Sequence, residues 1–177
     1  NAVGKLFGFA ESEIDGVMGT KVNLPAIIPT IAENDKVTIS YEGNVSDNNT
    51  KVDLTNITVG QSATVTATLA GSDQTTYTLL NSSLSLTVNV VPPAPTISST
   101  ATLEGDEITI TAAEGLDGAQ IYYSWDSDDE EGLPYEDNPP TAQSGTLYAW
   151  VVVEDVTSPK AEQPFNVKKN IANLTVY

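Results

Sequence analysis

The sequence predicts an all-β chain made of two tandem β-sandwich domains. Apolar and polar residues alternate with a period of two in several segments, and turn-forming residues separate those segments at short intervals. A proline cluster interrupts the pattern near the middle, and apolar residues at helical spacing do not recur over a useful length. The 177 residues leave room for two domains of about 80–90 residues, enough for a seven-stranded sandwich each.

Three segments in the first half have the pattern of strands with one buried face. They are residues 37–41, 63–69 and 84–90, in which every second residue is apolar. Clusters of Asn, Asp, Gly and Ser lie between them and favour turns. We therefore assign residues 1–91 to the first sandwich.

Three prolines, Pro92, Pro93 and Pro95, end this alternation. Proline supplies no amide hydrogen to a β-ladder and fixes its own backbone angle. Because consecutive prolines favour extended polyproline II, residues 92–95 are predicted to form a short, semi-rigid linker. The second sandwich then covers residues 96–177.

A second series of strands is predicted after the linker, at residues 108–112, 119–125 and 146–153. Residues 170–177 also have the pattern of a strand, which either closes the second sandwich or begins a further module. Fifteen of the 24 acidic residues and most aromatic residues follow Pro93. Any recognition surface is therefore expected in the second half.

The composition excludes several classes of function. A formal net charge of −17 disfavours contact with nucleic acid or with an anionic membrane surface. The sequence has no Cys, His or Arg, so it lacks disulfides, thiol nucleophiles, the usual zinc sites, Ser-His-Asp triads and arginine clamps on phosphate. No apolar run approaches the roughly 20 residues that cross a bilayer. We therefore expect a protein that is not an enzyme, binds no nucleic acid and does not insert into a membrane.

Several motifs of the second half carry a family resemblance. An Ile-Tyr-Tyr strand at residues 121–123 is followed by an acidic turn, then by an aromatic strand at residues 145–153 and by Ser158. With these motifs, residues 95–169 resemble the immunoglobulin- or fibronectin-like module at the C-terminus of chitobiase and β-hexosaminidase. Residues 125–128 depart from it, with Trp and Asp-Ser-Asp where the family prefers Thr and Asp-Gly-Ser. That module is a non-catalytic accessory, and the resemblance implies the same role.

The strand rhythm of the first half, at residues 37–41, 59–71 and 86–88, is similar to that of bacterial immunoglobulin-like surface repeats. Such repeats are common in secreted and surface proteins of gut-dwelling Bacteroidetes. The two resemblances together imply two tandem immunoglobulin-like β-sandwiches in an extracellular or bacterial cell-surface protein. Since the first residue is Asn1 and not Met, we expect a processed or trimmed chain whose signal segment lies outside this sequence.

A dense acidic turn is a candidate metal site. Its carboxylates belong to Asp126, Asp128, Asp129, Glu130 and Glu131. Oxygen ligands at this density suit Ca²⁺, and Asp126, Asp128 and Glu130 fit the opening of a calcium loop, although Glu131 stands where that loop needs Gly. The alternative is a solvated acidic turn. Adjacent acids on one loop do not build the separated carboxylate pair of a glycoside hydrolase.

Three aromatic residues form a candidate ligand-binding stripe. If Tyr123 faces the core, alternation sends Tyr122 outward. If Ala149 is buried, as the Ala-x-Ala strand of the resembled family implies, Tyr148 and Trp150 also point outward. Tyr122, Tyr148 and Trp150 would then form an exposed platform for sugar rings or for another domain. The alternative is that a loop or another domain covers them.

Two functions are consistent with these observations. The first is a non-catalytic structural or adhesion module, a spacer or presenting domain, with neighbouring domains of the parent protein or another surface protein as partners. The alternative is a carbohydrate-binding accessory module of a secreted glycan-processing system, with a polysaccharide as partner. Whether the stripe of Tyr122, Tyr148 and Trp150 is open distinguishes them.

Overall fold

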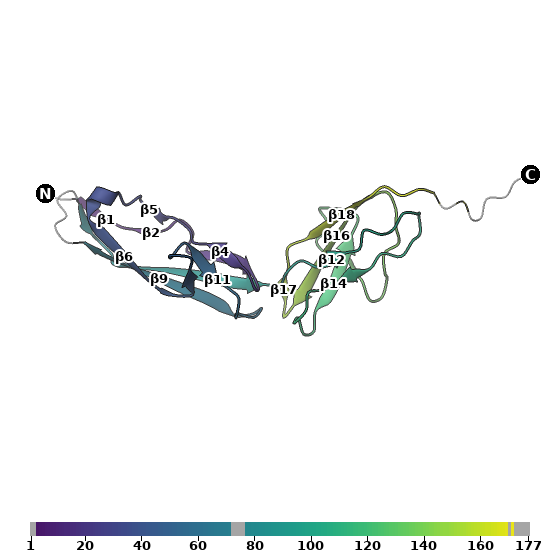
Figure 1. Ribbon diagram of the computed structural model, residues 1–177, viewed down its shortest axis with the longest axis horizontal. Helices are drawn as coiled ribbons and strands as arrows, with labels where there is room; N and C mark the ends of the chain where they lie inside the picture. Colours follow the sequence, from purple (N-terminus) through teal and green to yellow (C-terminus); the bar gives the residue numbers. More distant parts are fainter. Residues whose placement is uncertain (1–2, 72–76, 170, 172–177) are drawn as a thin grey trace, which may run out of the picture. The chain divides into compact units, whose positions relative to one another are not determined.

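The computed structural model describes residues 3–71, 77–169 and 171 (Figure 1). Within that part the protein consists of strands and loops, with one short 3-10 helix at Glu33–Asp35, so the predicted all-β fold is confirmed. No helix of the described residues is long and apolar enough to cross a membrane. The chain divides into two compact units, Asn1–Val91 and Pro92–Tyr177, and the division falls where the proline cluster begins. The strand predicted at residues 170–177 lies outside the described residues, apart from Ile171.

The first unit contains a four-stranded sheet with the strand order β3-β11-β9-β6. Its strands are β3 (Glu13–Val17), β6 (Val37–Gly43), β9 (Ser62–Gly71) and β11 (Ser83–Val91). β11 pairs in parallel with β3 and antiparallel with β9, which pairs antiparallel with β6. The three strands predicted in this half of the sequence are therefore confirmed.

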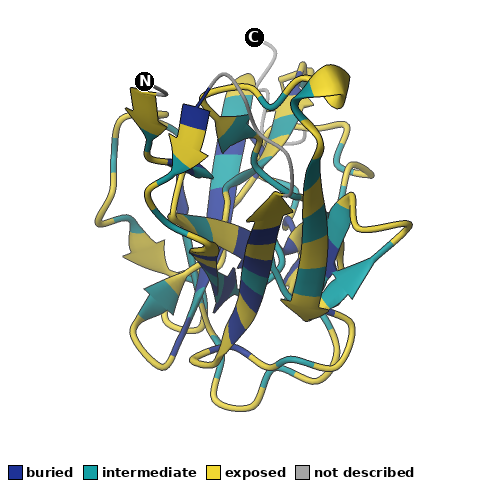
Figure 2. Ribbon diagram, turned by 90° about the vertical axis from the view of Figure 1, so that its left-hand side faces the viewer, coloured by how far each residue is buried: buried dark blue, intermediate teal, exposed yellow. Residues whose placement is uncertain are grey.

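A second sheet of this unit has the order β4-β8-β7. The remaining strands of the unit are β1 (Val3–Lys5), β2 (Gly8–Phe9), β4 (Lys21–Asn23), β5 (Ile27–Ile28), β7 (Val45–Ser46), β8 (Lys51–Asp53) and β10 (Tyr77–Leu79). β2 pairs with β5, and β1 pairs with β10. Val52 from one sheet and Val65 and Leu86 from the other are fully buried in one core. Buried and exposed residues alternate along the strands (Figure 2).

The strand order of the first unit is that of an immunoglobulin-like sandwich. β4, β8 and β7 pair in the order of strands B, E and D of such a domain, and β2 pairs with β5 in a separate two-stranded sheet. β6, β9 and β11 pair in the order of strands C, F and G, and β3 extends that sheet in parallel with β11. These two orders occur in the two sheets of constant-type immunoglobulin domains, and this unit adds β3 to the second of them.

The second unit repeats part of this scheme, with a larger sheet in the C-F-G order and a separate two-stranded sheet. Its strands are β12 (Thr96–Ile97), β13 (Ile110–Thr111), β14 (Gln120–Ser124), β15 (Leu133–Pro134), β16 (Gly145–Val153), β17 (Val156–Thr157) and β18 (Ala161–Phe165). β14 and β18 flank β16, β15 extends the sheet beyond β14, and β12 pairs with β13. The core of the unit contains Ile110, Tyr123, Leu147 and Phe165.

The predicted strands at residues 119–125 and 146–153 are confirmed as β14 and β16, whereas the strand at residues 108–112 is shortened to β13. Ile108 is buried, but its N–H donates to the carbonyl oxygen of Pro140 in a loop. The apolar alternation therefore predicts the burial of Ile108 correctly, but its backbone hydrogen bond goes to a loop and not to a strand.

Candidate functional site

The pairing of β14 with β16 places Tyr122 directly opposite Trp150. Their rings stack with centroids 6.4 Å apart and planes inclined by 17°. Leu147 and Ala149 on β16 belong to the core, so Trp150 projects from the opposite face of the strand. The sequence therefore predicted the correct face for Tyr122 and Trp150.

Trp150 nevertheless is not exposed, and the prediction of an open aromatic stripe is wrong. Only 2% of its surface is accessible, while Tyr122 and Tyr148 are half-buried. The turn that follows β14 folds over the indole, and a Cβ added to Gly132 would lie 2.6 Å from its Cη2. The Nζ of Lys160 lies 4.9 Å from the ring centroid. We call Tyr122, Gly132, Trp150 and Lys160 the Trp150 cluster.

Lys160 fixes the acidic turn to this cluster. Its ammonium donates hydrogen bonds of 3.0 Å to the carbonyl oxygens of Ser127 and Asp129. The hydroxyl oxygen of the buried Ser124 accepts a 3.1 Å hydrogen bond from the N–H of Asp126 at the start of the turn. A lysine ammonium thus supplies positive charge inside the most acidic segment of the chain.

The carboxylates of the turn are used to organise its backbone. Asp129 Oδ1 accepts hydrogen bonds from the N–H groups of Glu131 and Gly132, at 2.9 and 3.0 Å. Asp126 Oδ1 accepts one from the N–H of Asp128 at 3.0 Å. The Gly132 amide foremost, and then the Ser124 hydroxyl, hold the pKa of the Asp129 carboxyl below its usual range.

The calcium site predicted at Asp126, Asp128 and Glu130 is not assembled. Among residues 3–71, 77–169 and 171, no group of three or more acidic side chains is placed to hold a metal ion. The geometry explains this, because the turn directs the Asp126 carboxylate to a backbone amide and takes its positive charge from Lys160. The segment has the form of the acidic turn that the sequence allowed as the alternative.

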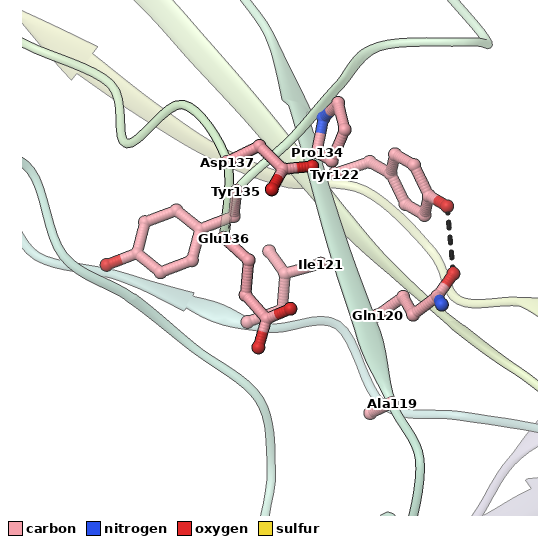
Figure 3. Close-up of a pocket in the computed structure, with 8 residues that line it drawn as sticks. All are labelled: Ala119, Gln120, Ile121, Tyr122, Pro134, Tyr135, Glu136 and Asp137. Carbon is pink, nitrogen blue, oxygen red and sulfur yellow. Dashed lines mark hydrogen bonds between the residues drawn. The ribbon is translucent and has the colours of Figure 1, made fainter.

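A groove of about 450 Å³ opens beside β14 (Figure 3). Its lining residues are Ala119, Gln120, Ile121, Tyr122, Pro134, Tyr135, Glu136 and Asp137. The N–H of Tyr135 donates a 2.9 Å hydrogen bond to the carbonyl oxygen of Ile121, and just beyond that bond the chain leaves the edge of β14. The groove lies at this departure. Of the three residues in the predicted stripe, Tyr122 alone lines it.

The sequence pattern did not indicate most residues of the groove, or the lysine that holds the acidic turn. Gln120, Tyr135, Glu136 and Asp137 line the groove, and Lys160 holds the turn, yet none of them was a candidate. Gln120 carried a usable signal, because it lies two residues before Tyr122 and period-two alternation places both on one face of β14. Glu136 and Asp137 follow a two-residue strand, where no periodic pattern indicates their direction.

The strand arrangement of both units defines the class of protein as a tandem of two immunoglobulin-like β-sandwiches. No family model matches the sequence, and no curated protein matches it. Solved structures similar to the chain include Sidekick-1 immunoglobulin domains 1–4, at 11% sequence identity and a TM-score of 0.31. That match covers 93% of this chain and 48% of the other, so this chain spans about half the length of its match. The immunoglobulin-like assignment rests on the strand pairing.

Proposed function

We propose that the chain is a non-catalytic structural or adhesion module, a spacer or presenting segment of an extracellular or bacterial cell-surface protein. The observation that carries this proposal is that Trp150 packs against residues of its own unit and is not open to a partner. Trp150, the largest side chain of the predicted stripe, is buried by the turn of its own unit. Each unit also has its own buried core, as expected of a module that holds other domains apart.

The chemistry of the side chains supports the same proposal. Without Cys, His or Arg, the chain has only carboxylates, lysines and hydroxyls as polar reactive groups. In the acidic turn, the Asp126 and Asp129 carboxylates accept backbone hydrogen bonds, and Lys160 donates to carbonyl oxygens. These groups therefore stabilise the turn.

Replacement of the chain within its parent protein tests the proposal. An unrelated pair of immunoglobulin-like domains of equal length is inserted in its place, and surface presentation of the flanking domains is measured on intact cells by antibody binding. A spacer is expected to be replaceable without loss of presentation, whereas an adhesion segment is expected to keep presentation and lose attachment to the partner. Product formation by the purified chain from polysaccharide or peptide substrates would overturn the non-catalytic proposal.

A carbohydrate-binding accessory module is the second candidate, and the groove beside β14 is the observation that favours it. Two tyrosines, an amide and two carboxylates line a volume of about 450 Å³ there. Pockets that combine aromatic surface with a few polar groups are the common form of small-ligand sites. Affinity electrophoresis of the purified chain in gels containing soluble polysaccharides tests this candidate, with retarded migration as the expected result.

A further inference from the structure

We propose that the groove beside β14 binds a sugar unit that carries no acidic group, either neutral or amine-bearing, and that it rejects acidic sugars. The inference rests on the carbohydrate-binding candidate and deepens it by naming the ligand class. The groove volume of about 450 Å³ falls within the range of roughly 300–1,000 Å³ that is typical of small-molecule sites.

The apolar part of the groove suits the carbon faces of a sugar ring. Ile121, Pro134 and the two tyrosines, Tyr122 and Tyr135, line it. Figure 3 shows Ile121 on the side of β14 that faces Tyr135 and Glu136. Aromatic rings combine a large apolar face with a polar tip, so they contact both the C–H groups and the hydroxyl groups of a saccharide.

Tyr122 is held in place before any ligand arrives. Its ring stacks on the buried Trp150, and its hydroxyl donates a 2.9 Å hydrogen bond to the Oε1 of Gln120 (Figure 3). A side chain fixed in this way loses little conformational entropy on binding. The Trp150 cluster therefore supports one wall of the groove.

The polar side chains of the groove are the Gln120 amide, the two carboxylates and the tyrosine hydroxyls. Gln120 Oε1 accepts the Tyr122 hydroxyl, so the amide nitrogen of Gln120 remains as a donor towards a ligand. Glu136 and Asp137 are exposed carboxylates that line the groove. Ionised carboxylates accept hydrogen bonds strongly, and sugar hydroxyls and ammonium groups both donate them.

The charge of the groove selects against acidic ligands. No lysine lines it, and the ion pair found within the described residues joins Lys21 to Asp47 in the first unit. The negative charges of Glu136 and Asp137 are therefore not balanced by an ion pair there. Like charges brought together at a binding site lower affinity, whereas an amine-bearing sugar gains from the same charges.

Binding to an array of neutral, amine-bearing and acidic oligosaccharides tests the proposal. The fluorescently labelled chain is expected to bind neutral or amine-bearing sugars at least tenfold more tightly than acidic ones, and binding of amine-bearing sugars is expected to weaken as salt is added. Equal binding of acidic sugars, or no binding to any class, would overturn it.

Paired variants show whether the groove is responsible. Glu136→Gln with Asp137→Asn removes both carboxylates and is expected to reduce the discrimination against acidic sugars at least fivefold. The matched control, Asp128→Asn with Glu130→Gln, makes the same change in net charge on the acidic turn, outside the groove lining. This control is expected to keep the discrimination of the unaltered chain. Equal effects of the two pairs would assign the selectivity to the overall field and overturn the proposal.

The outcomes separate this inference from the function on which it rests. Gln120→Ala removes the amide donor and frees the Tyr122 hydroxyl, so it is expected to weaken binding of a neutral sugar severalfold. If glycan binding persists unchanged in all groove variants, the carbohydrate-binding function stands and the groove is not its site. If neither the array nor the polysaccharide gels retain the chain, the carbohydrate-binding function is wrong as well. Replacement of the chain within its parent protein still tests the structural proposal.

Discussion

Gly132 packs its backbone against the indole of Trp150, so closely that a Cβ at Gly132 would lie 2.6 Å from Cη2 of the ring. Gly132 also has a φ of +65°, in the left-handed region that side-chain-bearing residues rarely adopt. Glycine, which has no Cβ, allows both the close approach to the ring and the left-handed backbone. The acidic turn and the tryptophan therefore act as one packed unit, in which the turn removes the ring from solvent.

A Gly132→Ala substitution is expected to destabilise the second unit by about 2–4 kcal/mol, from the left-handed backbone and the overlap with the indole together. Gly118→Ala is the control, because Gly118 has a φ of +71° but a Cβ there would meet nothing within 4 Å. We expect about 1–2 kcal/mol for this control. Urea unfolding followed by fluorescence measures both, and equal losses would contradict a close contact with Trp150.

Trp150→Ala is expected to destabilise the second unit by about 3–5 kcal/mol, the usual range for a large buried aromatic residue. Tyr148→Ala on the same face of β16 is the comparison, and because Tyr148 is half-buried its loss is expected to be smaller. The midpoints of chemical denaturation report the difference. A loss below about 1 kcal/mol for Trp150→Ala would show that the ring is more accessible than its contacts indicate.

The sequence predicted the strands and their faces because both follow from local alternation. Tyr123 and Ala149 lie in the core and Trp150 lies on the opposite face, as a period of two requires. Alternation does not show what covers an outward face. That depends on contacts between distant segments, such as the hydrogen bond from Lys160 to Ser127, 33 residues apart in the chain.

The directions in which the acidic side chains of the turn point also could not be predicted from the sequence pattern. The composition of the turn showed the density of carboxylates that a cation requires, and the position of Glu131 already argued against a calcium loop. Whether Asp126 and Asp129 point to a cation or to backbone amides depends on the path of the turn, which contact with Trp150 fixes at Gly132.

Lys160→Met is expected to destabilise the second unit by about 1–2 kcal/mol, because it removes charged hydrogen bonds to two carbonyl oxygens and the contact with the Trp150 ring. Methionine keeps most of the apolar stem, so packing is largely preserved. Lys168→Met serves as the control for loss of one positive charge in the same unit. Limited proteolysis is expected to cut the acidic turn faster in Lys160→Met alone. Equal cleavage of both variants would show that the hydrogen bonds of Lys160 do not hold the turn in place.

Asp129 is expected to make the stability of the second unit depend on pH in the acid range. Hydrogen bonds, first from the Gly132 amide and then from the Ser124 hydroxyl, lower the pKa of its carboxyl in the folded protein. In the unfolded chain an Asp titrates near about 3.9. Between these two values the unfolded state binds more protons than the folded state, so stability rises with pH there. The contribution of Asp129 is complete above about pH 4 and is lost as pH falls through the lower, folded pKa.

Asp129→Asn tests this dependence, since the amide oxygen still accepts hydrogen bonds but carries no charge. Both tryptophans lie in the second unit, so their fluorescence during urea unfolding follows this unit from pH 7 to pH 2. The variant is expected to be less stable than the unaltered chain at pH 7, with a shallower decline on acidification. At the lowest pH both carry an uncharged group at residue 129, and the gap between their unfolding free energies is expected to narrow. A gap that stays constant across the whole range would show that Asp129 acts on the turn through its shape and not through its charge.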